Sequence, residues 1–172
     1  MTPKRYRGLP GFDVVPIRMD LSDKTSIVNF IEAGKTYGEV SMLINAAGVS
    51  PSQASVETIL KVDLYGTAVL LEEVGKIIKE GGAGVTISSQ SGHRMPQLSA
   101  LEDELFACTP AEELLSLEIL QPENIKDTLY AYQMAKRCNE KRVMYEAVRW
   151  GEKGARINSI SPGIIVTPLA LD

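Results

Sequence analysis

The fold is decided by the stretch Ser41-Met-Leu-Ile-Asn45-Ala-Ala-Gly48, a short apolar run that ends in a turn of small residues. Residues 41–45 have the length and the apolar character of a buried strand. A long helical stretch follows over residues 56–80, and Gly81 and Gly82 stop it. A buried strand with a helix behind it is the repeating unit of a parallel sheet covered by helices.

The same alternation of strand and helix extends to both sides of this stretch. The further predicted strands are residues 14–19, 84–89 and 155–160, and the further predicted helices lie around Ile27 and over residues 127–150. We therefore expect an α/β fold, a partial Rossmann-like, doubly wound parallel sheet with helices on both faces. One domain over residues 1–172 accounts for the whole chain.

Composition narrows the class of protein. The 172 residues are 44% hydrophobic and 23% charged, as in ordinary globular domains, and the net charge of −4 gives no general attraction to nucleic acid or to anionic lipid. No apolar run approaches the ~20 residues that cross a bilayer. Cys108 and Cys138 have no metal-ligand spacing, so we expect no metal site and a cytoplasmic location. A small-molecule partner is the expectation that remains.

An acidic insertion separates the third predicted strand from the helix that should follow it. Residues 94–126 contain seven acidic residues, and the only basic residue after Arg94 is Lys126. Thr109-Pro-Ala-Glu112 has the pattern of a capping box and predicts one short amphipathic helix. The insertion either packs its leucines on its own domain, with the acidic side chains in water, or serves as a substrate lid or a dimer contact.

Tyr132 and Lys136 form the first candidate for chemistry. Their i,i+4 spacing on the last long helix places both side chains on one face of that helix. A nearby ammonium favours the phenolate, so we expect Lys136 to lower the pKa of Tyr132 and to make it a general acid or base. The same pair could equally be an ordinary surface pair.

The position of other polar residues supports the chemical interpretation, because each follows a predicted strand, where parallel sheets place their sites. Together these residues resemble the short-chain dehydrogenase/reductase family from about Val14 to Leu169. The motifs that carry the resemblance are Asp20-Leu21, Asn45-Ala-Ala-Gly48, Val62-Asp-Leu-Tyr-Gly66, Ile87-Ser-Ser-Gln-Ser-Gly92, Tyr132-x-x-x-Lys136, and Asn158-Ser-Ile-Ser-Pro-Gly163 with Thr167.

The resemblance implies an NAD(P)-dependent oxidoreductase that interconverts a secondary alcohol and a ketone. It assigns proton exchange to Tyr132, a hydrogen bond to the substrate oxygen to Ser89, and the nicotinamide ribose to Lys136. The implied cofactor-binding residues are Asp20 and Leu21 at the adenine, the turn Asn45, Ala46, Ala47 and Gly48, Tyr132 and Lys136, and Pro162, Gly163, Ile165 and Thr167 toward the carboxamide. The insertion resembles that of bacterial 3α-hydroxysteroid dehydrogenase and carbonyl reductase relatives, so a hydroxysteroid is one candidate substrate.

Two departures from the family pattern qualify this expectation. Asp63 stands where the family has a catalytic asparagine, and it remains a catalytic candidate. The chain begins where the third strand of the family begins, without a Gly-x-x-x-Gly-x-Gly turn for the pyrophosphate, so we expect weak binding of NAD or NADP by this chain alone. The alternative is a noncatalytic, truncated remnant or an interaction subunit of such an enzyme.

Two further expectations concern assembly and the only histidine. In the family, the helices corresponding to residues 56–80 and 127–150 pair with those of a second subunit, which implies a homodimer or homotetramer in which Gly66 would allow close approach. His93 has no Asp or Cys at ligand spacing, so we expect neither a metal-binding nor a triad role for it.

Overall fold

The computed structural model describes residues 13–165 of the chain. In chain order the elements are α1 (Lys24–Lys35), β1 (Met42–Asn45), α2 (Val56–Ile59), the π-helix η1 (Leu60–Gly66), α3 (Thr67–Ile77), β2 (Ala83–Ile87), α4 (Ser91–Arg94), α5 (Ala100–Cys108), α6 (Ala111–Leu114), the 3₁₀ turns η2 (Glu118–Leu120) and η3 (Pro122–Asn124), α7 (Thr128–Gly151) and β3 (Arg156–Ile160). The predicted alternation of strands and helices is confirmed from β1 onward.

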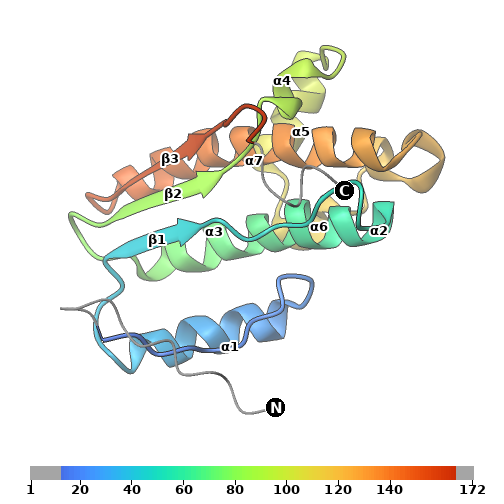
Figure 1. The fold of residues 1–172 in the computed structure, drawn as a ribbon. Helices are drawn as coiled ribbons and strands as arrows, with labels where there is room; N and C mark the ends of the chain where they lie inside the picture. Colours follow the sequence, from blue (N-terminus) through green and yellow to red (C-terminus); the bar gives the residue numbers. More distant parts are fainter. Residues whose placement is uncertain (1–12, 166–172) are drawn as a thin grey trace, which may run out of the picture.

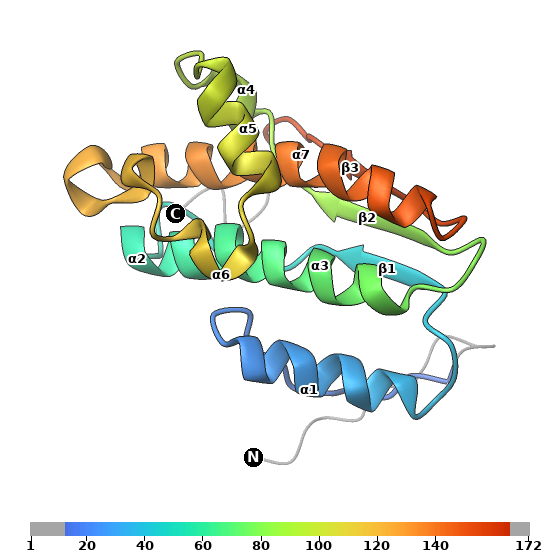
Figure 2. The same ribbon diagram turned by 180° about the vertical axis from the view of Figure 1, so that it is seen from behind.

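The sheet is parallel, with the order β1-β2-β3 (Figure 1). The side of the sheet that carries Gly84 and Ile157 is buried against α3 and α7, and Trp150 of α7 fills the space over Gly84. On the other side, Met42 and Ile44 are exposed. Within residues 13–165, therefore, the two long helices cover one face of the sheet and not both, as Figures 1 and 2 show.

The predicted strand over residues 14–19 is wrong. This segment has no regular secondary structure and runs beside α1 (Figure 1). A strand needs a neighbour that exchanges backbone hydrogen bonds with it, and no strand of the described residues lies next to this segment. The helix predicted behind it is confirmed as α1, capped by Asp23, whose carboxylate accepts hydrogen bonds from the backbone N–H groups of Thr25 and Ser26.

The long helix predicted over residues 56–80 is present but interrupted. Its middle is the π-helix η1, and α3 ends at Ile77, ahead of Gly81, whose φ of 75° suits glycine. A Cβ on Gly66 would overlap the carbonyl oxygen of Leu21, so the absence of a side chain at this position is needed for packing inside the chain.

The acidic insertion packs on the rest of its own chain. Figure 2 shows α5 lying across α7 and α6 lying against α3, on the side away from the sheet. Phe106 and Leu114 are fully buried there, and Asp103 binds Arg137 and Lys141 of α7 at 2.6 and 2.9 Å. The insertion thus occupies part of the helical surface that we expected to meet a second subunit.

The capping box predicted at Thr109 is wrong. Thr109 ends α5, donating its backbone N–H to Leu105, and α6 begins after Pro110 without a side-chain cap. The capping box of the insertion lies instead at the start of α5, where Ser99 and Glu102 bond each other's backbone.

Candidate active site

One cavity of about 580 Å³ lies at the carboxyl ends of the three strands. The segment after β1 lines it with Ala46, Ala47 and Gly48, the segment after β2 with Ser89, α7 with Tyr132 and Lys136, and the segment after β3 with Pro162, Gly163, Ile164 and Ile165. Four segments that are far apart in the sequence therefore meet at one place. Arg94 and Lys136 are the charged side chains among the described residues that line the cavity.

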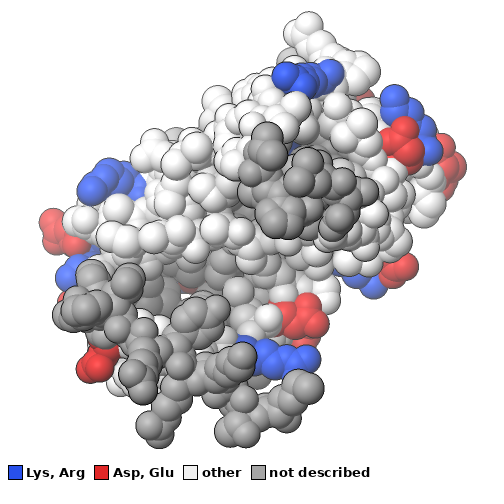
Figure 3. All heavy atoms as spheres, in the orientation of Figure 1, with Lys and Arg blue, Asp and Glu red and all other residues white. Residues whose placement is uncertain are grey.

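The face that contains the sheet is poor in charge. In Figure 3, which has the orientation of Figure 1, the blue and red side chains lie around the margin of the molecule, and its middle is largely white. The described side chains that line the cavity are mostly uncharged, and its two charged groups, Arg94 and Lys136, are basic.

Tyr132, Ser89 and Lys136 converge in this cavity. Tyr132 is half-buried, and its hydroxyl is hydrogen-bonded to the Ser89 side chain. The ammonium of Lys136 lies over the Tyr132 ring, with its nitrogen 5.3 Å from the ring centroid. This arrangement can present a phenol and an alcohol to one substrate oxygen.

Burial governs the ionisation of Tyr132. Removal from water raises the pKa of the phenol; the hydrogen bond from Ser89 opposes this, and the Asp63 carboxylate adds to it, so the net direction is upward. Our expectation that Lys136 lowers the pKa of Tyr132 is therefore wrong for this structure. The cause is desolvation of the ring, which has the largest effect on this pKa.

Lys136 is a buried cation with unused donors. Its side chain is 6% exposed, and its ammonium donates one hydrogen bond, to the carbonyl oxygen of Ile87 at 3.2 Å. Burial lowers its pKa, while Asp63 raises it. An ammonium has three N–H donors, so two remain to bind hydroxyl groups in the cavity. This donor set fits the ribose of a nicotinamide nucleotide.

Asp63 lies behind the small-residue turn. It is 1% exposed, its Oδ1 accepts a hydrogen bond from the backbone N–H of Val49 at 2.8 Å, and its Oδ2 has no partner among the described residues. A Cβ on Gly48 would stand 3.0 Å from this Oδ1. Burial raises the pKa of Asp63, whereas Lys136 and the Val49 N–H group lower it, in that order. The carboxylate thus holds the turn from within the protein.

Three of the predicted cofactor residues that the structure describes do not line the cavity. Asp20 is exposed and accepts hydrogen bonds from Ser22, Leu21 is buried against Gly66, and Asn45 is buried, with its amide 3.3 Å from the Thr67 hydroxyl. Thr167 lies outside the described residues.

A polar network beside the cavity was missed from the sequence. Glu140 lies on α7, and its Oε1 is 2.8 Å from His93 Nε2, 2.7 Å from the Ser161 hydroxyl and 3.2 Å from the Ser88 hydroxyl. His93 Nε2 is also 3.3 Å from Ser161 Oγ, so one ring nitrogen meets both partners, unlike the arrangement of a catalytic triad. No local pattern signals this cluster, because its members are far apart in the sequence.

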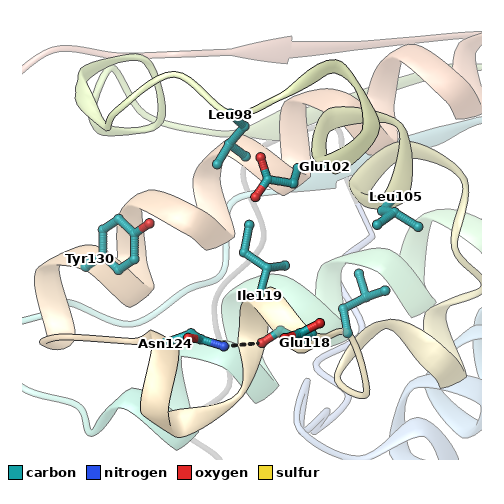
Figure 4. Close-up of a pocket in the computed structure, with 8 residues that line it drawn as sticks. Leu98, Glu102, Leu105, Glu118, Ile119, Asn124 and Tyr130 are labelled. Carbon is teal, nitrogen blue, oxygen red and sulfur yellow. Dashed lines mark hydrogen bonds between the residues drawn. The ribbon is translucent and has the colours of Figure 1, made fainter.

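A second cavity, of about 440 Å³, lies within the insertion (Figure 4). Leu98, Glu102, Leu105, Ile119 and Tyr130 are among the residues that line it, and the Asn124 amide donates to the Glu118 carbonyl oxygen at its floor. It contains none of the predicted catalytic residues. Over residues 13–165, no group of His, Cys, Asp and Glu is arranged to hold a metal ion, and no helix is long and apolar enough to span a membrane.

Comparison with known proteins identifies relatives. Residues 7–101 match the family model described as enoyl-(acyl carrier protein) reductase. A short-chain dehydrogenase/reductase from Alternaria brassicicola is 38% identical over 160 residues, which are 92% of this chain and 58% of that protein. The 3-alpha-hydroxysteroid dehydrogenase/carbonyl reductase of Comamonas testosteroni is 30% identical over 74% of this chain and 49% of its own length. The chain thus spans about half the length of these relatives.

The fold agrees with these matches. The crystal structure of the 3-alpha-hydroxysteroid dehydrogenase from Pseudomonas sp. B-0831, in complex with NADH, superimposes with a TM-score of 0.70 at 24% identity, covering 89% of this chain and 60% of that one. The family model, the Alternaria relative and this superposition agree with the motifs and with the cavity in which they meet. The chain belongs to the short-chain dehydrogenase/reductase family.

Proposed function

We propose that this protein is an NAD(P)-dependent oxidoreductase that interconverts a secondary alcohol and a ketone. The observation that carries the proposal is the single cavity that Ser89, Tyr132 and Lys136 line together at the carboxyl ends of the strands. Relatives with dehydrogenase and reductase names support it, among them levodione reductase and D-threitol dehydrogenase.

The residues have separate tasks in this proposal. Tyr132 takes a proton from the substrate hydroxyl when the alcohol is oxidised and returns it to the oxygen when the ketone is reduced. Ser89 donates a hydrogen bond to the same oxygen. Lys136, with its two unused N–H donors, binds the ribose. A bound nicotinamide supplies or accepts the hydride.

The cofactor proposal rests on the fit of the chain's own groups. The turn over residues 46–48 consists of small residues that leave room for a flat ring, and Asp63 fixes the turn through Val49. Solved relatives hold NADH or NADPH, so we propose either nucleotide as the cofactor. We assign the NAD(P)-binding Rossmann-like domain to residues 1–172, with the acidic insertion at residues 94–126 as a part of it.

The substrate we propose is a small uncharged alcohol or ketone, with hydroxysteroids as the first class to test. Support comes from the mostly uncharged lining of the cavity and from the hydroxysteroid dehydrogenase relative of Comamonas testosteroni. We also propose a cytoplasmic location, because Cys108 and Cys138 are both free thiols.

The test compares two tyrosines of the same helix. Tyr132→Phe removes the proposed proton donor, so we expect turnover to fall by about 10²-fold or more on a panel of secondary alcohols and ketones with NAD(H) and NADP(H). Tyr130→Phe is the matched control, because Tyr130 lines the second cavity, and we expect it to keep its activity. Activity is followed by NAD(P)H absorbance, and cofactor affinity is measured by calorimetry.

Two results would overturn the proposal. Equal loss of activity in both tyrosine variants would remove Tyr132 from the chemistry. Absence of both cofactor binding and turnover in the purified chain would favour the noncatalytic alternative.

A further inference from the structure

Glu140 stands where three segments of the candidate site meet. It lies on α7 one turn beyond Lys136, and the residue is 8% exposed. Its Oε1 accepts hydrogen bonds from the hydroxyl of Ser161, in the segment after β3, at 2.7 Å and from that of Ser88, directly after β2, at 3.2 Å. His93 Nε2 of α4 lies 2.8 Å from the same oxygen. A buried carboxylate oxygen with three partners from three segments is a structural junction.

The segments after β2 and β3 each carry a proposed site residue beside their contact with Glu140. Ser88 directly precedes Ser89, and Ser161 directly precedes Pro162 and Gly163. The helix itself carries Tyr132 and Lys136, two turns and one turn before Glu140. A shift of any one segment relative to Glu140 would therefore displace a residue that lines the cavity.

The contacts of Glu140 connect the ends of β2 and β3 to α7, which the backbone hydrogen bonds between these strand ends do not. The ends of β2 and β3 are already joined by backbone hydrogen bonds, from Ser88 N to Ile160 O at 2.8 Å and from Gln90 N to Pro162 O at 3.0 Å. Those bonds fix the two strand ends to each other, but they do not connect either strand end to α7. The Ser88 hydroxyl, 2.9 Å from the Lys136 carbonyl oxygen, and the Glu140 carboxylate connect this pair of strand ends to α7.

We propose that Glu140 is a positioning residue, which fixes the segments carrying Ser89 and Pro162-Gly163 to the helix that carries Tyr132 and Lys136. It touches neither substrate nor cofactor, and it acts through the alignment of the residues that do. The expected fall in kcat rests on the proposed function, whereas the alignment of the segments by Glu140 does not.

The test uses two substitutions at position 140. Glu140→Ala removes all three contacts, and we expect kcat to fall by about 10- to 100-fold with little change in the KM for the alcohol, because a misplaced reacting group slows the chemical step. Glu140→Gln keeps an oxygen that accepts from both serines, so we expect it to restore kcat to within about three-fold of the unmodified chain. Rescue by the amide separates hydrogen bonding from charge.

A matched control lies on the same helix. Glu146 is also a buried carboxylate of α7, 1% exposed and bonded to Arg149 at 2.9 Å, but it is not among the residues that line the cavity. Glu146→Ala should lower thermal stability and leave kcat unchanged at a temperature where all variants are folded. Equal loss of kcat in Glu146→Ala, or full kcat in Glu140→Ala, would overturn the positioning role, as would failure of Glu140→Gln to rescue.

A second measurement needs no turnover. Backbone amide exchange of the ligand-free chain, read by mass spectrometry, should quicken in residues 88–94 and 158–163 of Glu140→Ala and stay unchanged in residues 67–77. If the unmodified chain has no activity, the proposed function fails and the exchange data alone judge Glu140. Unchanged exchange in residues 88–94 and 158–163 would overturn the junction itself.

Discussion

At the scale of single residues, Asp63 places a carboxyl group in the interior near Lys136. The effect of its ionisation on stability can be measured. Burial raises the pKa of Asp63 and lowers that of Lys136, so desolvation outweighs their mutual attraction for both groups. A folded-state pKa above the ordinary value of about 3.9 means that ionisation costs stability as the pH rises through the folded-state pKa.

We therefore expect Asp63→Asn to raise the melting temperature at pH 7. The amide oxygen can still accept from Val49, and the gain should disappear as the pH falls well below the ordinary pKa of about 3.9, where the carboxyl is protonated in both states. Asp103→Asn is the control of opposite sign. Burial alone would raise the pKa of Asp103, but hydrogen bonds from Arg137 and Lys141 lower it, so this change should destabilise at pH 7. Circular dichroism melts from about pH 3 to 8 test both predictions, and a lower melting temperature of Asp63→Asn at pH 7 would contradict the assigned balance.

Residues of the site were predictable where chemistry and chain position coincide. The i,i+4 spacing places Tyr132 and Lys136 on one helix face, whereas Ser89 was assigned to the same site by its position after a strand and by the resemblance to the family. Glu140 and His93 are 47 residues apart, and only tertiary packing joins them. The direction of the pKa shift of Tyr132 was missed for the same reason, because burial of a side chain is a property of its neighbours.

At the scale of elements, the helices of the insertion depend on tertiary packing more than on a local sequence pattern. The capping-box pattern at Thr109 predicted one short helix, and α6 lies there, whereas α5 was not predicted. The two helices form where Phe106 and Leu114 can be buried against α7 and α3. Its acidic residues lack local partners, but Asp103 finds two cations on α7, and Glu72 of α3 binds the buried Arg142. Such partners cannot be predicted from a short stretch of sequence, because they are far apart along the chain.

The packing of α5 can be tested by truncating one side chain. Phe106 is 0% exposed, so Phe106→Ala should lower the free energy of unfolding by about 3–5 kcal/mol in urea titrations. Leu101 on the same helix is 65% exposed, and Leu101→Ala should change it by less than about 0.5 kcal/mol. Similar values for the two variants would mean that α5 does not pack on α7 as described.

At the scale of the whole molecule, the open question for experiment is self-association. The insertion covers part of α3 and α7, but the last turns of α7 expose Met144, Tyr145 and Val148, and Met144 and Val148 share one helix face. We propose that the chain forms a homodimer or homotetramer through this face. Parallel order and helix alternation were predictable from hydrophobic pattern, whereas the surface left free for a partner depended on where the insertion folds.

The double substitution Met144→Glu and Val148→Glu should convert the assembly to a monomer, because paired carboxylates cannot be buried without partners. Light scattering at tens of micromolar chain measures the mass. Leu129→Glu, at an exposed position near the start of α7, is the control and should leave the mass unchanged. A monomeric unmodified chain would contradict the proposed assembly.

Trp150 gives the molecule a built-in optical reporter. It is the only tryptophan of the chain, it is fully buried, and its indole lies between Gly75 of α3 and Gly84 of β2, where an added Cβ would stand 2.6 and 2.8 Å from it. Tryptophan fluorescence therefore reports on one place, the interface between the helices and the sheet. Emission from this indole records separation of those two layers, and it does so apart from any event in the insertion or in the cavity.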